Sequence, residues 1–164
     1  DWEATALMAA AYTDNLSVVE LLVNAGADIN AITVDGGTAL MIAIEGHSDE
    51  AIDLLIDLGA DINATDDDGE TVLMQVINEN LSGTVSSLLF SNGKNVNARD
   101  SNGETALMKA LEMTNWDYYY MIRSLIEAGA NVNIRDNDGR TALRIWDENH
   151  SRIKQLLQNA GATF

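Results

Sequence analysis

The chain has 164 residues and a formal net charge of −17 at pH 7, and it contains no cysteine and no proline. The lack of cysteine excludes disulfides and thiolate metal sites. Its apolar runs are far shorter than the roughly 20 residues of a membrane-spanning helix, so we expect no membrane contact. We also expect no nucleic-acid partner, because an acidic surface repels phosphates.

The charge is unevenly distributed along the sequence. The first 93 residues hold 17 of the 26 acidic residues and no Lys or Arg, whereas residues 94–164 hold nine acidic and nine basic residues. One interpretation is that the acidic charge only keeps the protein soluble. A second interpretation is adaptation to high salt. Such adaptation should acidify the whole surface, whereas here residues 94–164 are neutral overall. The sharper hypothesis is an acidic patch that recruits a protein partner with a basic or mixed-charge surface.

A Thr-x-Leu triplet recurs five times, at spacings of 33, 33, 34 and 36 residues, and a glycine follows each second apolar run. Each threonine can cap a helix through its hydroxyl, and each glycine suits the left-handed position that ends one. A period near 33 predicts a solenoid in which every unit buries its face against its neighbours. The threonines are Thr5, Thr38, Thr71, Thr105 and Thr141, and the glycines are Gly26, Gly59, Gly93, Gly129 and Gly161.

Two buried columns of leucines are expected from this register. Asp-Gly or Asn-Gly pairs, which favour hairpin turns, precede four of the triplets. The first helices would contribute Leu7, Leu40, Leu73, Leu107 and Leu143 to one column, and the second helices Leu22, Leu55, Leu89, Leu125 and Leu157 to the other.

The units close on Gly-Ala-Asp-Ile-Asn or a close variant, as at Gly26–Asn30 and Gly59–Asn63. With Thr-Ala-Leu-Met and the hairpin signals, this pattern resembles the ankyrin repeat over essentially the whole chain. The resemblance implies an all-α repeat solenoid, a stack of helix-turn-helix units with β-hairpin loops. We expect a single domain, 1–164, with repeats at about 1–32, 33–65, 66–99, 100–135 and 136–164.

The pattern departs from the family at two residues of the motif that begins each first helix, the proline and the histidine. Thr-Ala-Leu-Met replaces the usual Thr-Pro-Leu-His, and it looks like the variant common in bacterial ankyrin proteins.

The last repeat looks like a C-terminal cap, because its second helix turns polar on one face, whereas the first repeat looks internal. Since solenoid ends normally need polar caps, we expect the N-terminal face to be covered by upstream residues, by another subunit or by Trp2.

The resemblance also implies where a partner binds, because ankyrin proteins use a concave surface of hairpin tips and first helices. The acidic tip cluster is expected to comprise Asp35, Asp67, Asp68 and Glu70. Further candidates are Asn102, Glu104, Asp138 and Arg140 at later tips, and Tyr12 and Glu45 at the ends of first helices. The alternative is that these residues form ordinary solvated turns, which Asp and Asn favour.

A second candidate is the aromatic segment Trp116–Met121, inside the repeat that carries extra residues. Counting back from Gly129 places the core of the second helix at Met121 and beyond. Trp116 and some of the tyrosines, among them Tyr118 and Tyr119, are therefore expected in an extended turn between helices. Aromatic side chains with a polar tip are typical interface anchors. The other interpretation is that they pack locally over the insertion and stiffen it.

No nucleophile–base pair, metal-ligand set or cofactor motif stands in the chain, so no catalytic residue and no cofactor is expected. The sequence therefore predicts a non-enzymatic scaffold that binds a partner protein on a concave acidic surface. The alternative is a structural or regulatory segment of a longer repeat protein, acting by repeat stacking or by self-association through the uncapped N-terminal repeat.

Overall fold

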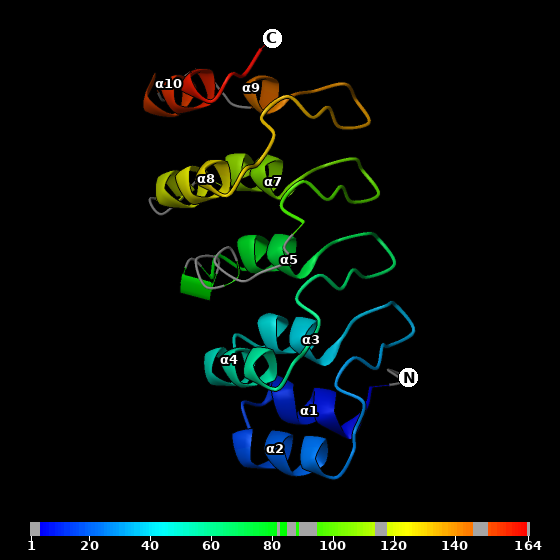
Figure 1. The fold of residues 1–164 in the computed structure, drawn as a ribbon. Helices are drawn as coiled ribbons and strands as arrows, with labels where there is room; N and C mark the ends of the chain where they lie inside the picture. The colour runs from blue at the N-terminus through cyan, green and yellow to red at the C-terminus, as the bar shows by residue number, and fades with distance from the viewer. Residues whose placement is uncertain are drawn as a thin grey trace. The chain divides into compact units, whose positions relative to one another are not determined.

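The structure, a computed structural model, describes residues 4–81, 83–84, 88, 95–113, 118–145 and 151–163 (Figure 1). The chain forms two compact units, Asp1–Leu81 (unit 1) and Ser82–Phe164 (unit 2). All regular secondary structure within the described ranges is helical, apart from isolated β-bridges. Among these residues, no helix is long and apolar enough to cross a membrane.

Unit 1 is built from short helices joined by turns. In each of the first two pairs, the first helix packs against the second and also against the first helix of the following pair. The loops that enter α3 and α5 each close through one antiparallel bridge, Ile32 with Thr38 and Thr65 with Thr71. The helices are α1 (Ala6–Tyr12), α2 (Leu16–Asn24), α3 (Ala39–Glu45), α4 (Asp49–Asp57) and α5 (Val72–Asn78).

Unit 2 repeats this arrangement with some variation. Helix α7 packs against α8 and α9, and α9 packs against α10. The bounds are α7 (Ala106–Glu112), α8 (Tyr118–Glu127), α9 (Ala142–Ile145) and α10 (Ser151–Asn159).

The repeat threonines begin the first helices as expected. The hydroxyl oxygens of Thr5 and Thr71 each accept a hydrogen bond from the backbone N–H three residues later, at 3.2 Å, and Thr38 and Thr105 do the same at 3.4 Å. Such a bond satisfies one of the amide groups left unpaired at a helix start. Thr141 differs, because its buried hydroxyl donates to the carbonyl oxygen of Thr163 at 3.5 Å.

All five leucines predicted for the first column are buried within their own units, each at most 8% exposed. In the second column Leu55, Leu125 and Leu157 are buried, but Leu22 is only half-buried. Leu89 lies outside the described residues. Within each unit, the core is therefore an apolar layer repeated between the helices.

Candidate functional site

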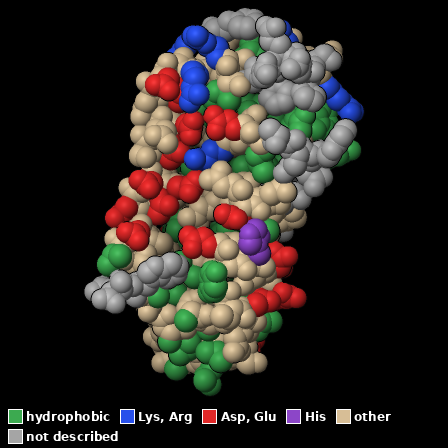
Figure 2. Space-filling model, turned by 180° about the vertical axis from the view of Figure 1, so that it is seen from behind, with side chains coloured by type: hydrophobic (Ala, Val, Ile, Leu, Met, Phe, Trp, Pro, Cys, Tyr) green, Lys and Arg blue, Asp and Glu red, His purple; other side chains and the backbone are tan. Residues whose placement is uncertain are grey.

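The acidic tip cluster lies on two neighbouring hairpins of unit 1. The backbone N–H of Asp67 donates to the carbonyl oxygen of Asp35 at 3.1 Å, which joins the two tips directly. This approach requires Gly36, which has φ +80°, because a Cβ there would lie 2.8 Å from the Asp67 nitrogen. Asp35, Asp67 and Asp68 are exposed, and Figure 2 shows acidic side chains gathered on unit 1.

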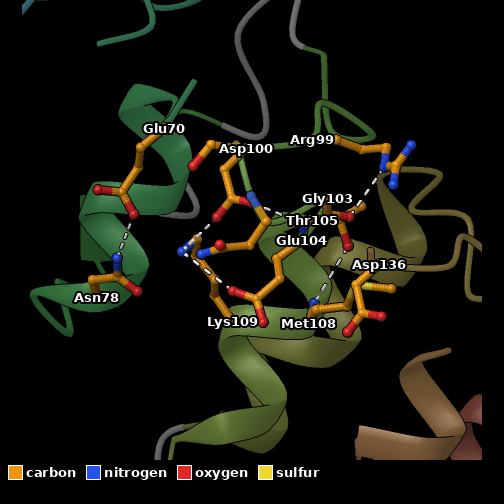
Figure 3. A network of polar contacts seen from close by, with 12 residues as sticks. Glu70, Asn78, Arg99, Asp100, Gly103, Glu104, Thr105, Met108, Lys109 and Asp136 are labelled. Carbon is orange, nitrogen blue, oxygen red and sulfur yellow. Dashed lines mark hydrogen bonds and ion pairs between the residues drawn. The ribbon is translucent and has the colours of Figure 1, made fainter. Parts of the chain in front are cut away.

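Glu70, the fourth member of the cluster, sits deeper than the other three. Its Oε1 accepts a hydrogen bond from Asn78 Nδ2 at 2.5 Å, which ties the hairpin to the end of α5 (Figure 3). Tyr12 and Glu45 occupy the last positions of α1 and α3, and both are exposed. The structure thus brings the four predicted acidic residues together in unit 1, with Tyr12 and Glu45 on its first helices.

The pKa of Glu45 is raised above its ordinary value of 4.5. Partial burial of the carboxyl group is the largest cause, and the negative charges of Glu79 and Asp66 add to it. Although the residue as a whole is exposed, its carboxylate stands in a negative environment that a bound cation would relieve.

A cavity of about 130 Å³, which the sequence did not predict, opens beside Glu45. Its lining combines apolar groups with carboxylates and one amide: Thr33, Val34, Asp35, Gly37, Ile42, Glu45, Asp66 and Gln75. Gln75 is only 9% exposed, and among the described residues its Oε1 has no hydrogen-bond partner. A buried acceptor without a donor costs about 1–3 kcal/mol, so this group favours a ligand that brings a donor.

In unit 2, the predicted residue Glu104 belongs to an ion-pair cluster rather than to an open tip. Lys109 Nζ lies 2.9 Å from Asp100 Oδ2 and 3.8 Å from Glu104 Oε2 (Figure 3). The pKa of Glu104 is raised, first by burial and then by the charge of Glu112, while Lys109 and Arg140 oppose the shift. Asn102, in contrast, is exposed at its hairpin tip.

Arg140 is also engaged inside unit 2. Its Nε donates to Asp136 Oδ2 at 2.6 Å, and its second guanidinium nitrogen donates to Glu104 Oε1 at 3.2 Å. Asp138, which is exposed, lies 3.9 Å from the same Nε. Although burial alone would raise the pKa of Asp136, the hydrogen bonds and charge of Arg140 hold it below its ordinary 3.8. Arg140 therefore stabilises its own hairpin.

This pair gives a pH-dependent prediction. Asp136→Asn should lower the free energy of unfolding by about 1–3 kcal/mol near neutral pH, because the charge-assisted bond to Arg140 is lost. Since the folded-state pKa is depressed, the carboxylate stabilises the fold above pH 3.8 and this contribution disappears as pH falls through the folded value. Urea unfolding across that range should show the deficit shrinking in acid.

The matched control is Asp138→Asn, because the Asp138 side chain is 79% exposed and stands 3.9 Å from the same guanidinium. We expect this change to alter stability by less than about 0.5 kcal/mol. Equal losses in the two variants, or a deficit in Asp136→Asn that does not depend on pH, would contradict the role given to Asp136.

The remaining arginines of unit 2 bond to hairpin carbonyls. Arg99 Nε donates to the carbonyl oxygen of Gly103 at 3.0 Å, and its terminal nitrogen donates to that of Arg135 at the same distance. Arg135 in turn donates to the carbonyl oxygen of Gly139 at 2.7 Å. These side chains link and brace the hairpins of unit 2 through their own hydrogen bonds.

The aromatic segment corrects one expectation. Helix α8 covers Tyr118–Glu127, so Tyr118, Tyr119 and Tyr120 are helical and do not lie in an extended turn. Arg152 of α10 stacks 4.5 Å from the centre of the Tyr119 ring, and such a cation–π contact favours local packing. Tyr120 is 69% exposed. Trp116 lies outside the described residues.

A family model described as ankyrin repeats, three copies, matches the chain over residues 1–66, 48–136 and 73–163. These matches cover nearly the whole sequence, and the chain belongs to the ankyrin repeat family. Ankyrin repeats are generally protein–protein interaction modules, and proteins built from them are typically non-enzymatic scaffolds. No curated protein matches this chain.

Proposed function

We propose that this protein is a non-enzymatic scaffold that binds a partner protein on the acidic hairpin surface of unit 1. The observation that carries the proposal is the joining of Asp35 to Asp67 through a backbone hydrogen bond, which sets several exposed carboxylates close together. The partner surface is basic or mixed in charge, since like charges across an interface cost several kcal/mol.

The charge of unit 1 supports this choice of surface. Its 81 residues contain 17 acidic residues and no Lys or Arg. In unit 2, Lys109 and Arg140 are paired with acidic neighbours. A one-sign surface attracts an oppositely charged partner over roughly a Debye length, about 8–10 Å at physiological ionic strength.

Affinity capture from the source organism tests the proposal. The wild-type chain and a variant with Asp35, Asp67, Asp68 and Glu70 all changed to Lys are compared as bait at low salt. We expect at least one protein to be held by the wild type and lost by the variant. Identical captures from the two baits would refute an acidic binding surface at these tips, and would move the search to Asn102, Asp138 or the tyrosines of α8.

The exposed apolar face of α2 favours a second candidate, self-association. Leu21 and Val18 are 67% and 36% exposed, whereas Ala51 of α4, 33 residues after Val18 in the repeat register, is fully buried. Apolar side chains also gather near α1 and α2 in Figure 2. A second copy of the chain, packing face to face, would bury them.

Sedimentation of the wild type and of Leu21→Glu distinguishes the two candidates. If this face joins two copies, the wild type should sediment as a dimer at micromolar concentration and Leu21→Glu as a monomer, because an ionised carboxylate is costly to bury. A wild type that stays monomeric at every concentration rules the second candidate out.

A further inference from the structure

The residues that line the cavity beside Glu45 are suited to bind a single cationic side chain. Val34 and Ile42 supply apolar walls, while Glu45, Asp66 and Gln75 supply oxygen acceptors. Its volume of about 130 Å³ is close to that of a cavity of about 150 Å³ that holds a benzene molecule, so one side chain fits and a folded segment does not.

The unpaired acceptor in this cavity is the feature that points to a ligand. Gln75 belongs to α5 and is more than nine-tenths buried, and no described residue forms a hydrogen bond with its Oε1. Asp66 uses Oδ1 to accept the backbone N–H of Glu70 at 2.8 Å, and in the described part of the chain no hydrogen bond reaches its Oδ2. The cavity therefore presents hydrogen-bond acceptors, and a ligand that binds there must supply hydrogen-bond donors.

Unit 2 shows how the same register binds an ammonium group. Gln75 stands four residues after the capping Thr71, and Lys109 stands four residues after the capping Thr105. Asp66 and Asp100 likewise precede their capping threonines by five residues. Lys109 Nζ binds Asp100 at 2.9 Å (Figure 3). In unit 1 the carboxylate is present at that register position, but glutamine replaces the lysine.

We infer that this cavity receives a lysine side chain of the partner protein, whose ammonium group binds between Asp66, Glu45 and Gln75 Oε1. An ammonium group has three N–H donors and no acceptor, which matches three oxygen acceptors. Its aliphatic stem would pack against Val34 and Ile42, as lysine stems do on apolar surfaces. The pKa of Glu45 is raised by burial and by the negative charges of Glu79 and Asp66, both of which a bound ammonium group would offset. The inference rests on the proposed function and names the anchor of that interface.

A peptide titration tests the cavity directly. The probe is acetyl-Gly-Lys-Gly-amide, its control is the same peptide with an acetylated lysine, and the full chain is observed by NMR. We expect saturable shifts of the Gln75 side-chain amide and the Glu45 carboxyl with the lysine peptide alone. Equal shifts with both peptides, equal shifts with potassium chloride at the same concentration, or no shift up to the solubility limit would overturn the inference.

A variant separates this inference from the proposed function. Gln75→Lys supplies an internal ammonium group at the position that Lys109 occupies in unit 2. It should abolish the peptide-induced shift of the Glu45 carboxyl and weaken binding of the captured partner at least 10-fold. Gln75→Leu removes the acceptor without adding a charge. It is the folding control, and it should weaken peptide binding.

The outcomes then separate cleanly. In one outcome, Gln75→Lys still binds the partner at wild-type strength and the four-lysine tip variant does not bind it. This outcome would support the proposed function and overturn the inference of a lysine-binding cavity. If capture yields no partner at all, the proposed function fails, while the peptide titration still decides whether the cavity accepts a lysine.

Discussion

Leu40→Ala should destabilise the protein by about 3–5 kcal/mol, the upper range for truncating a fully buried leucine. Leu40 is 0% exposed and belongs to the column that passes from one first helix to the next. Its loss removes packing and leaves a cavity that the rigid neighbours fill only in part. Because domains of this size are stable by roughly 5–15 kcal/mol, the change should move the urea midpoint strongly.

The matched control for this substitution is Leu21→Ala. Both changes remove the same atoms from a helix, but Leu21 is 67% exposed, so we expect a loss below about 1 kcal/mol. Comparing the two urea midpoints isolates the contribution of the column. Similar losses at the two positions would contradict the assignment of Leu40 to the core.

The second large effect concerns the rate of partner binding. The association rate constant should fall by about 100-fold as salt rises from roughly 0.01 M to 1 M, because the Debye length shrinks from about 30 Å to 3 Å. The dissociation rate should change much less. Unit 1 is the source of this effect, since all 17 of its charged residues other than His47 are acidic.

Stopped-flow mixing of the full chain with the captured partner measures both rate constants. An association rate that stays constant over this salt range would remove the electrostatic part of the account. It would leave binding by the ankyrin repeats themselves in place, because apolar contact does not need charge steering.

The helices and their caps could be predicted because local signals determine them. Thr5, Thr38 and Thr71 each precede an apolar run, and the hydroxyl of each bonds to an amide only three residues away. Glycine at Gly26 and Gly59 has positive φ for a reason that is equally local. A motif at a regular period therefore predicted the core without knowledge of contacts between repeats.

The cavity could not be predicted because its lining comes from three separate segments. Val34 lies on a hairpin, Glu45 ends α3 and Gln75 belongs to α5. These three residues lie around one cavity only because neighbouring repeats pack against each other. One signal was available in the sequence, however: Gln75 is a polar residue at a register position where Ile42 is apolar and Lys109 is charged.

The start of α8 was predicted wrongly for a different reason. The core positions Met121, Ile122 and Leu125 are buried as expected, but the helix continues back through the tyrosines to Tyr118. Tyrosine is tolerated in helices at only a small cost in propensity. The stacking of Arg152 on Tyr119, a contact from another helix, is not visible in the local sequence.

The most direct test of the central claim measures the dissociation constant of the captured partner for two variants of equal net charge. One carries the four lysines at Asp35, Asp67, Asp68 and Glu70. The other carries four lysines at exposed acidic positions of α2 and α4, namely Glu20, Glu50, Asp53 and Asp57. We expect the tip variant to lose at least about 100-fold in affinity and the helix variant to lose less than about 10-fold. Equal losses in the two variants would contradict a binding site at the hairpin tips.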